Sequence, residues 1–276
     1  MPLGAAPWIF SNPITVTPRR AVGRAEEERY RGMMRAFVFF ILLGLTSGTG
    51  APARAETLLS FYSGKSFSDN SDLTLRRPGA DTRLTFRDVA FGDESFTSPI
   101  YYGARVTHFF RSRPWLGASV DFFHYKVFAR TDRTVRAIGR ENGTPVDRRQ
   151  PLENTIQRFS ISHGVNYLTF NLLARQQWRR DTRFPNGRVQ PYAGAGLGLL
   201  LLHPESEIGG ESFQQYEWNG VGYHLFLGVD YRVTRRWGLF VEYKYNARKV
   251  NVAVVDGTAD TELSTHHLAF GASYRL

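Results

Sequence analysis

Residues Ser264–Leu276 have the sequence S-T-H-H-L-A-F-G-A-S-Y-R-L and decide the fold class. Apolar or aromatic residues occupy every second position from Leu268 onward, and small or polar residues stand between them. The first row is Leu268, Phe270, Ala272, Tyr274 and Leu276, and the second row is Ala269, Gly271, Ser273 and Arg275. A period of two is the period of a β-strand with one apolar face. The stretch therefore predicts an amphipathic strand.

The same alternation recurs upstream and predicts eight long strands. They are expected at residues 57–65, 99–110, 115–129, 163–178, 189–203, 216–233, 237–250 and 264–276. Long connections follow the first, third, fifth and seventh strands, and shorter connections follow the second, fourth and sixth. Residues 82–89 also alternate, which predicts a further strand beyond the membrane. The connections 131–162, 204–215 and 251–263 are expected to be loops, the first of them mobile and rich in arginine.

Long loops that alternate with short turns, over an even number of strands, are typical of small outer-membrane barrels. An even number also lets the first and last strands pair, which removes the open edges that a bilayer cannot satisfy. We therefore predict an all-β fold, an eight-stranded antiparallel transmembrane β-barrel in the outer membrane of a Gram-negative bacterium. Aromatic residues near the short turns would form its periplasmic girdle.

The alternative architecture is a soluble up-and-down barrel of the lipocalin kind, whose apolar row lines a ligand cavity. The second row of this chain is too polar to line such a cavity. Its charged residues are Arg105, Asp121, Arg175, Asp230, Arg232, Glu242 and Lys244. An eight-stranded barrel is only wide enough for side chains to fill it. We expect these residues to form ion pairs inside a plugged lumen.

Residues 1–55 have no strand pattern and are expected to be a leader. Met33 and Met34 precede the apolar run Ala36–Leu45, and Ala53-Arg54-Ala55 has the form of a signal-peptidase site. The run is shorter than a transmembrane helix. We predict an upstream extension, a signal peptide from about Met33 with cleavage after Ala55, and a barrel domain over residues 56–276. The start codon could be Met1 or Met33/Met34.

The net charge of +10 includes +4 from residues 1–55, because these contain seven arginines and three glutamates, so the barrel domain keeps +6. Its basic residues form no run and no recognition helix, and we predict no nucleic-acid partner. Behind a secretory leader, the anionic lipid of the outer membrane is the expected partner. The sequence has no cysteine, which excludes disulfides, thiolate metal sites and a cysteine nucleophile.

Several motifs carry a resemblance to known families. They lie at Pro99–Arg105, Asp121–Ala129, His163–Asn171, Tyr192–Gly198, Trp237–Lys244 and Leu263–His267. In architecture the chain resembles OmpA/OmpW-type small outer-membrane barrels. In these motifs it is similar to the lipid A oxidase-like family of rhizobia and related α-proteobacteria. Gly271, Tyr274 and Leu276 also resemble the C-terminal signal recognised by the barrel assembly machinery, although the usual last residue there is Phe.

The narrower resemblance implies oxidation of the proximal glucosamine of lipid A to an aminogluconate by molecular oxygen. Direct reaction of oxygen with a sugar requires a metal or an organic cofactor, and the chain has no nucleotide-binding glycine loop. The cofactor stays unknown, with a divalent metal as one option. The candidate catalytic residues are the histidines expected near the outer rim, namely His124, His163, His266 and His267.

The alternation places His124 on the lipid row and His163 on the lumen row, so that loops would have to bring these histidines together. The expected contacts with lipopolysaccharide are basic residues of the third strand and the following loop: Lys126, Arg130, Arg133 and Arg136. Ser264 and His266 share a strand face, as the serine and histidine of lipid A deacylases do, but in the reverse order.

Two further functions stay open at this point. One is a non-enzymatic barrel that stabilises the outer membrane or serves as an adhesin. The other is a small-solute channel, which a lumen crowded with charged pairs disfavours.

Overall fold

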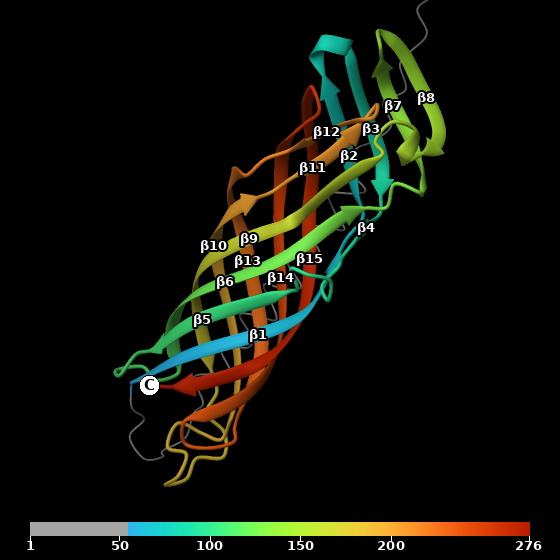
Figure 1. Ribbon diagram of the computed structural model, residues 1–276. Helices are drawn as coiled ribbons and strands as arrows, with labels where there is room; N and C mark the ends of the chain where they lie inside the picture. The colour runs from blue at the N-terminus through green and yellow to red at the C-terminus, as the bar shows by residue number, and fades with distance from the viewer. Residues whose placement is uncertain (1–54) are drawn as a thin grey trace, which may run out of the picture. The chain divides into compact units, whose positions relative to one another are not determined.

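The computed structural model describes residues 55–276, except for the side chains of Ser162 and His163. The expected leader lies outside the described residues. Eight antiparallel strands form a closed ring, because β15 pairs with both β14 and β1 (Figure 1). In ring order they are β1 (Glu56–Ser68), β5 (Tyr102–Phe109), β6 (Leu116–Ala129), β9 (Arg158–Arg175), β10 (Val189–Leu202), β13 (Glu217–Arg232), β14 (Trp237–Val254) and β15 (Gly257–Arg275). The predicted eight-stranded barrel is confirmed.

The strand faces follow the predicted alternation. Leu268 and Phe270 expose 52% and 55% of their surface on the outer wall, whereas Ala269 between them is fully buried. A β-carbon added to Gly271 would lie 2.2 Å from the carbonyl oxygen of Phe61, so the β1–β15 seam requires a glycine there. The other strands repeat the pattern, with Val106, Val120, Leu172, Leu197, Leu227 and Leu239 exposed. Such a band of exposed apolar side chains is typical of a lipid-facing wall. Within the described residues, no helix is long and apolar enough to cross a membrane.

Charged residues form ion pairs in the lumen, as predicted, and the structure groups them into two clusters. In the central cluster, Arg105 Nη1 lies 2.7 Å from Glu242 Oε2, and Lys244 Nζ lies 2.6 Å from Asp121 Oδ2. In the second cluster, the carboxylate of Glu56 contacts three arginines. These are Arg175 at 2.7 Å, Arg232 at 3.0 Å and Arg275 at 2.6 Å. A cavity of about 30 Å³ lined by residues of both clusters is large enough for only one or two water molecules. The lumen is therefore packed.

Three of the expected loops are strands instead. Residues 131–162 contain the hairpin of β7 (Thr134–Glu141) and β8 (Thr144–Pro151) and the start of β9, so the prediction of a mobile loop is wrong. Residues 204–215 form β11 (Glu205–Ile208) and β12 (Glu211–Gln214), and β14 and β15 run on through 251–263. The polar stretch after β1 is β2 (Ser71–Arg77), followed by a 3₁₀ turn (Pro78–Ala80), the expected strand β3 (Thr82–Val89) and β4 (Phe91–Gly92). A second 3₁₀ turn is Leu152–Asn154.

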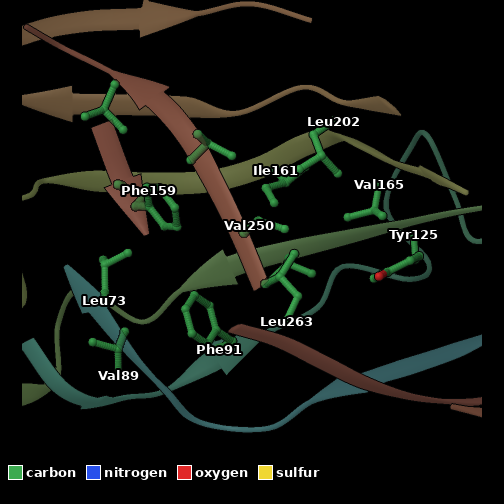
Figure 2. Packing of buried hydrophobic residues seen from close by; sticks show 14 of the residues in the cluster. Leu73, Val89, Phe91, Tyr125, Phe159, Ile161, Val165, Leu202, Val250 and Leu263 are labelled. Atoms are coloured by element: carbon green, nitrogen blue, oxygen red, sulfur yellow. The ribbon is translucent and has the colours of Figure 1, made fainter. Parts of the chain in front are cut away.

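These additional strands form a cap at the end of the barrel away from the C-terminus (Figure 1). We call it the extracellular cap, because the long connections of small outer-membrane barrels face the outside of the cell. β2 pairs with the upper part of β15, and β3, β7 and β8 continue the sheet in that order. The inner face of this sheet packs on apolar residues of the extended barrel strands (Figure 2). The cluster includes Leu73, Leu75, Leu84, Phe86, Phe159, Ile161, Leu202, Val250, Val252 and Leu263. The outer mouth of the barrel is thus covered by an apolar core.

Candidate functional site

A hydrogen-bonded series of three polar side chains lies on the outer wall where the lipid-facing band ends. Tyr243 of β14 places its hydroxyl oxygen 2.5 Å from Nδ1 of His266 on β15. On the opposite edge of the imidazole, Nε2 of His266 lies 3.4 Å from Oδ2 of Asp69, in the connection between β1 and β2. Leu268 and Phe270 continue the same face of β15 into the apolar band. The outer-wall triad, as we name Tyr243, His266 and Asp69, therefore adjoins the region that contacts lipid.

The strand pairing explains this arrangement. Tyr245 lies directly opposite His266, and their ring centroids are 5.0 Å apart, whereas Tyr243 approaches His266 diagonally. Cross-strand and diagonal neighbours on one face lie within reach of aromatic side chains. The backbone N–H of Asp69 donates a hydrogen bond to the carbonyl oxygen of Ser264 at 2.9 Å, which fixes the connection beside the histidine.

The contacts of His266 define what the triad can do chemically. Carboxylates accept hydrogen bonds, so the Nε2–H group of a neutral ring donates to Asp69 and leaves Nδ1 to accept from the hydroxyl of Tyr243. A histidine oriented by a carboxylate and bonded to a hydroxyl is an arrangement suited to general acid–base catalysis. All three side chains are partly accessible, with 29% of the His266 side chain and 40% of the Asp69 side chain exposed.

The four predicted catalytic histidines do not share one site. His267 faces the lumen, where its Nε2 lies 2.5 Å from Oδ1 of Asn246 and its ring packs on Tyr125 at 4.8 Å. His124 keeps the outward parity, but its ring is buried, stacks on Tyr102 at 5.1 Å and lies 3.1 Å from Asn166 Oδ1. The side chain of His163 lies outside the described residues. Of His124, His266 and His267, only His266 belongs to the outer-wall triad.

The predicted lipopolysaccharide contacts differ in accessibility. Lys126 is buried, and its ammonium group donates to the carbonyl oxygens of Thr97 at 3.1 Å and Ser98 at 3.0 Å. Arg130, Arg133 and Arg136 are exposed at the base of the β7–β8 hairpin.

Arg136 forms an ion pair in this hairpin. Its Nε and Nη2 atoms donate to the carboxylate of Asp147 at 2.8 and 2.7 Å, and these bonds lower the pKa of Asp147. The geometry is that of a bidentate arginine–carboxylate pair.

Sequence reasoning missed Tyr243 and Asp69, and it also missed His224. His224 is buried in the lumen, where its Nδ1 lies 2.9 Å from Oδ1 of Asn171 and its ring packs on Phe123. The position of Tyr243 in the two-residue alternation predicted that its side chain points outward, but its contact with His266 depends on the register between β14 and β15. In the described part of the chain, no three His, Asp or Glu side chains converge to hold a metal ion. The described residues thus do not fit a metal centre.

The deacylase pattern is not assembled either. The hydroxyl of Ser264 lies 3.5 Å from that of Tyr245, and the two nitrogens of His266 contact Tyr243 and Asp69. Asp69 supplies an acidic partner for the histidine. Its hydroxyl partner is a tyrosine.

Comparison with known proteins decides the family. The model of the outer membrane protein beta-barrel domain matches residues 40–275. The chain belongs to this family. It is an outer-membrane β-barrel protein. A comparison with curated proteins found no match.

Solved structures with a similar fold include one surface protein and two outer-membrane proteins. Neisserial surface protein A is 13% identical, with coverage of 81% of this chain and 100% of that chain and a TM-score of 0.39. OprG from Pseudomonas aeruginosa is 12% identical, with coverage of 82% and 98% and a TM-score of 0.41. The outer membrane protease OmpT from Escherichia coli is 10% identical, with coverage of 84% and 99% and a TM-score of 0.42.

Proposed function

We propose that this barrel acts on lipid A in the outer leaflet, with His266 as its acid–base group. The observation that carries the proposal is the position of the outer-wall triad, on the same face of β15 as Leu268 and Phe270. Acyl chains that lie against this apolar face bring the sugar headgroup of the same molecule to the level of the triad. A catalytic group for such a substrate has to lie outside the barrel, because the lumen is packed.

In this proposal Tyr243 presents its hydroxyl to the substrate, and His266 accepts or returns the proton at Nδ1. Asp69 holds the ring in the required orientation through Nε2 and stabilises the imidazolium form. Groups that transfer protons in this way typically contribute about 10²–10⁴-fold to a rate. Replacement of His266 should therefore remove most of the activity while the barrel stays folded.

The specific reaction that we propose is oxidation of the proximal glucosamine of lipid A to an aminogluconate. This part rests on the resemblance of the sequence motifs to the lipid A oxidase-like family. Proton removal from a sugar hydroxyl is the step that the triad could serve. This oxidation releases two electrons, and by the same resemblance molecular oxygen would be their acceptor. A metal or organic cofactor would have to supply that electron transfer, and we assign no residue of this chain to holding one.

A second candidate is a non-enzymatic barrel that stabilises the outer membrane or serves as an adhesin. The packed lumen and the apolar core of the extracellular cap favour it, because both make the molecule rigid from the periplasmic turns to the tips of its hairpins. In this case the outer-wall triad would serve only to fix the β1–β2 connection on the wall.

Mass spectrometry of lipid A, from cells with and without the expressed protein, distinguishes these functions. A gain of one oxygen atom supports the oxidase, and loss of an acyl chain would instead indicate a deacylase. Unchanged lipid A, with the protein folded in the outer membrane, would contradict the enzyme and leave the structural barrel.

A further inference from the structure

The outward face of the extracellular cap carries two rows of arginines that lie directly opposite one another across neighbouring strands. The upper row crosses β2, β3 and β7, and the lower row crosses β3, β7 and β8. The upper row is Arg76, Arg83 and Arg140, and the lower row is Arg87, Arg136 and Arg149. β2, β3 and β7 bury their alternate residues in the apolar core, and Arg149 of β8 lies directly opposite Arg136, so that both rows face away from the core.

Like charges directly opposite each other destabilise a sheet, and only some of these arginines are neutralised. Four have acidic partners, with Arg76 paired to Asp260 at 3.0 Å as one example. The other pairs are Arg87–Asp72, Arg136–Asp147 and Arg140–Asp81. Among the described residues, Arg83 and Arg149 have no ion-pair partner. Each row thus contains one exposed guanidinium group that is free to bind an anion.

The surface between the rows is uncharged over three strands. Thr74, Thr85 and Ile138 lie there side by side, and the hydroxyl groups of Thr74 and Thr85 are 3.0 Å apart. Arg83 and Arg87 are four residues apart on β3, so the rows are separated by about 13 Å, at about 3.3 Å per residue. Two rows with one free guanidinium group each, on either side of an uncharged strip, fit a chain of sugars with phosphate groups on both sides.

We propose that the two arginine rows, which together we name the arginine face, bind the phosphorylated sugars of lipopolysaccharide. Planar guanidinium groups bind phosphate oxygens bidentately, which favours arginine over lysine at such a surface. The inference rests on the proposed function in taking lipopolysaccharide as the ligand, but it uses a separate set of residues.

The position of the face along β15 selects this ligand. Thr258, which pairs with Arg76, lies on the outward row of β15 ten residues from Leu268. That separation is about 33 Å along a strand, or roughly 25 Å above the apolar band at the tilt usual for barrels. The arginine face is thus a continuation of the lipid-facing wall at the height of the sugars, above the headgroup of lipid A.

Binding of purified lipopolysaccharide to the full barrel in nanodiscs tests the inference. The probes are lipopolysaccharide with its sugar phosphates and the same preparation after chemical dephosphorylation. The variant is Arg83→Gln with Arg149→Gln, since neither residue has an ion pair to lose. The matched control is Arg111→Gln with Arg235→Gln, which removes two exposed charges at the turns of the opposite end.

We expect the variant to bind the phosphorylated probe about tenfold more weakly or worse, since charge-assisted hydrogen bonds at exposed sites are lost. The control should match the wild type, and dephosphorylation should weaken wild-type binding by a similar factor. Equal binding of the two probes by the wild type would overturn the inference even if the variant failed to fold. If the wild type binds the phosphorylated probe as expected but lipid A from expressing cells is unmodified, the binding inference stands and only the proposed enzymatic function is rejected.

Discussion

The ammonium nitrogen of Lys244 lies 2.6 Å from Oδ2 of Asp121 at the centre of the lumen, and both side chains are fully buried. Asp121 also accepts a hydrogen bond from the hydroxyl of Tyr62 at 2.6 Å, and Arg105 lies 3.2 Å away. These contacts join β6, which carries Asp121, to β14, which carries Lys244 and lies far from β6 in the sequence. Removing one member of such a network leaves its partner charged in a dry environment.

Lys244→Met should therefore destabilise the barrel by about 3–5 kcal/mol. Urea unfolding of the protein in lipid vesicles, followed by tryptophan fluorescence, measures this change. Lys249→Met is the matched control, because Lys249 lies exposed on the same strand. Equal midpoints for the two variants would show that the central cluster contributes little to stability.

The barrel should not conduct ions. The two charge clusters fill the lumen, and the apolar core of the cap covers its outer mouth. Planar-bilayer recordings of the purified protein should show no steady openings under conditions in which a porin conducts. Reproducible single-channel steps that depend on this protein would contradict the packed lumen.

The β7–β8 hairpin should behave as ordered structure. Val135 and Ala137 are buried on its inner face, and its strands pair from Thr134–Pro151 to Glu141–Thr144. In hydrogen exchange, the amides of β7 that pair with β3 and β8 should be protected far longer than those of the exposed turn 111–114. Exchange at the rate of that turn would instead support a mobile loop.

Asp147 should titrate below its usual range. Arg136 holds its carboxylate form by two hydrogen bonds, which lowers the pKa of Asp147. A lowered folded-state pKa means that the pair stabilises the hairpin above the unfolded-state pKa of about 3.9, and that this contribution is lost as the pH falls through the folded-state value. Carbon-13 NMR should show the Asp147 midpoint rise in Arg136→Gln, whereas an unchanged midpoint would exclude the pair in solution.

The ring of eight strands was predictable because lipid outside and charged side chains inside impose a strict alternation on each strand. Of the cap, only the strand β3 was predicted, although two turn signals were present. Asn142 and Gly143 have φ of 47° and 78°, as a tight hairpin requires, and the sequence Asp256-Gly257 marks the turn between β14 and β15. The arginine-rich strands beside the first turn obscured Val135 and Ala137, the two apolar residues that the hairpin buries.

The candidate site could be predicted only in part. Parity placed His266 on the outer wall, but the pairing of β14 with β15 brings Tyr243 to it, and Asp69 comes from a connection 197 residues earlier. His124 shows the converse limit. Its parity is outward as predicted, yet stacking on Tyr102 buries the ring, and a period of two contains no information about such packing.

The most direct test of the account compares lipid A from cells that express the wild type, His266→Gln or His108→Ala. His108 also lies on the outer wall, where its Nδ1 is 2.9 Å from the hydroxyl of Thr57, and it has no place in the triad. We expect lipid A with one added oxygen atom for the wild type and His108→Ala, and unmodified lipid A for His266→Gln. Full modification by folded His266→Gln, or unmodified lipid A with the folded wild type, would contradict it.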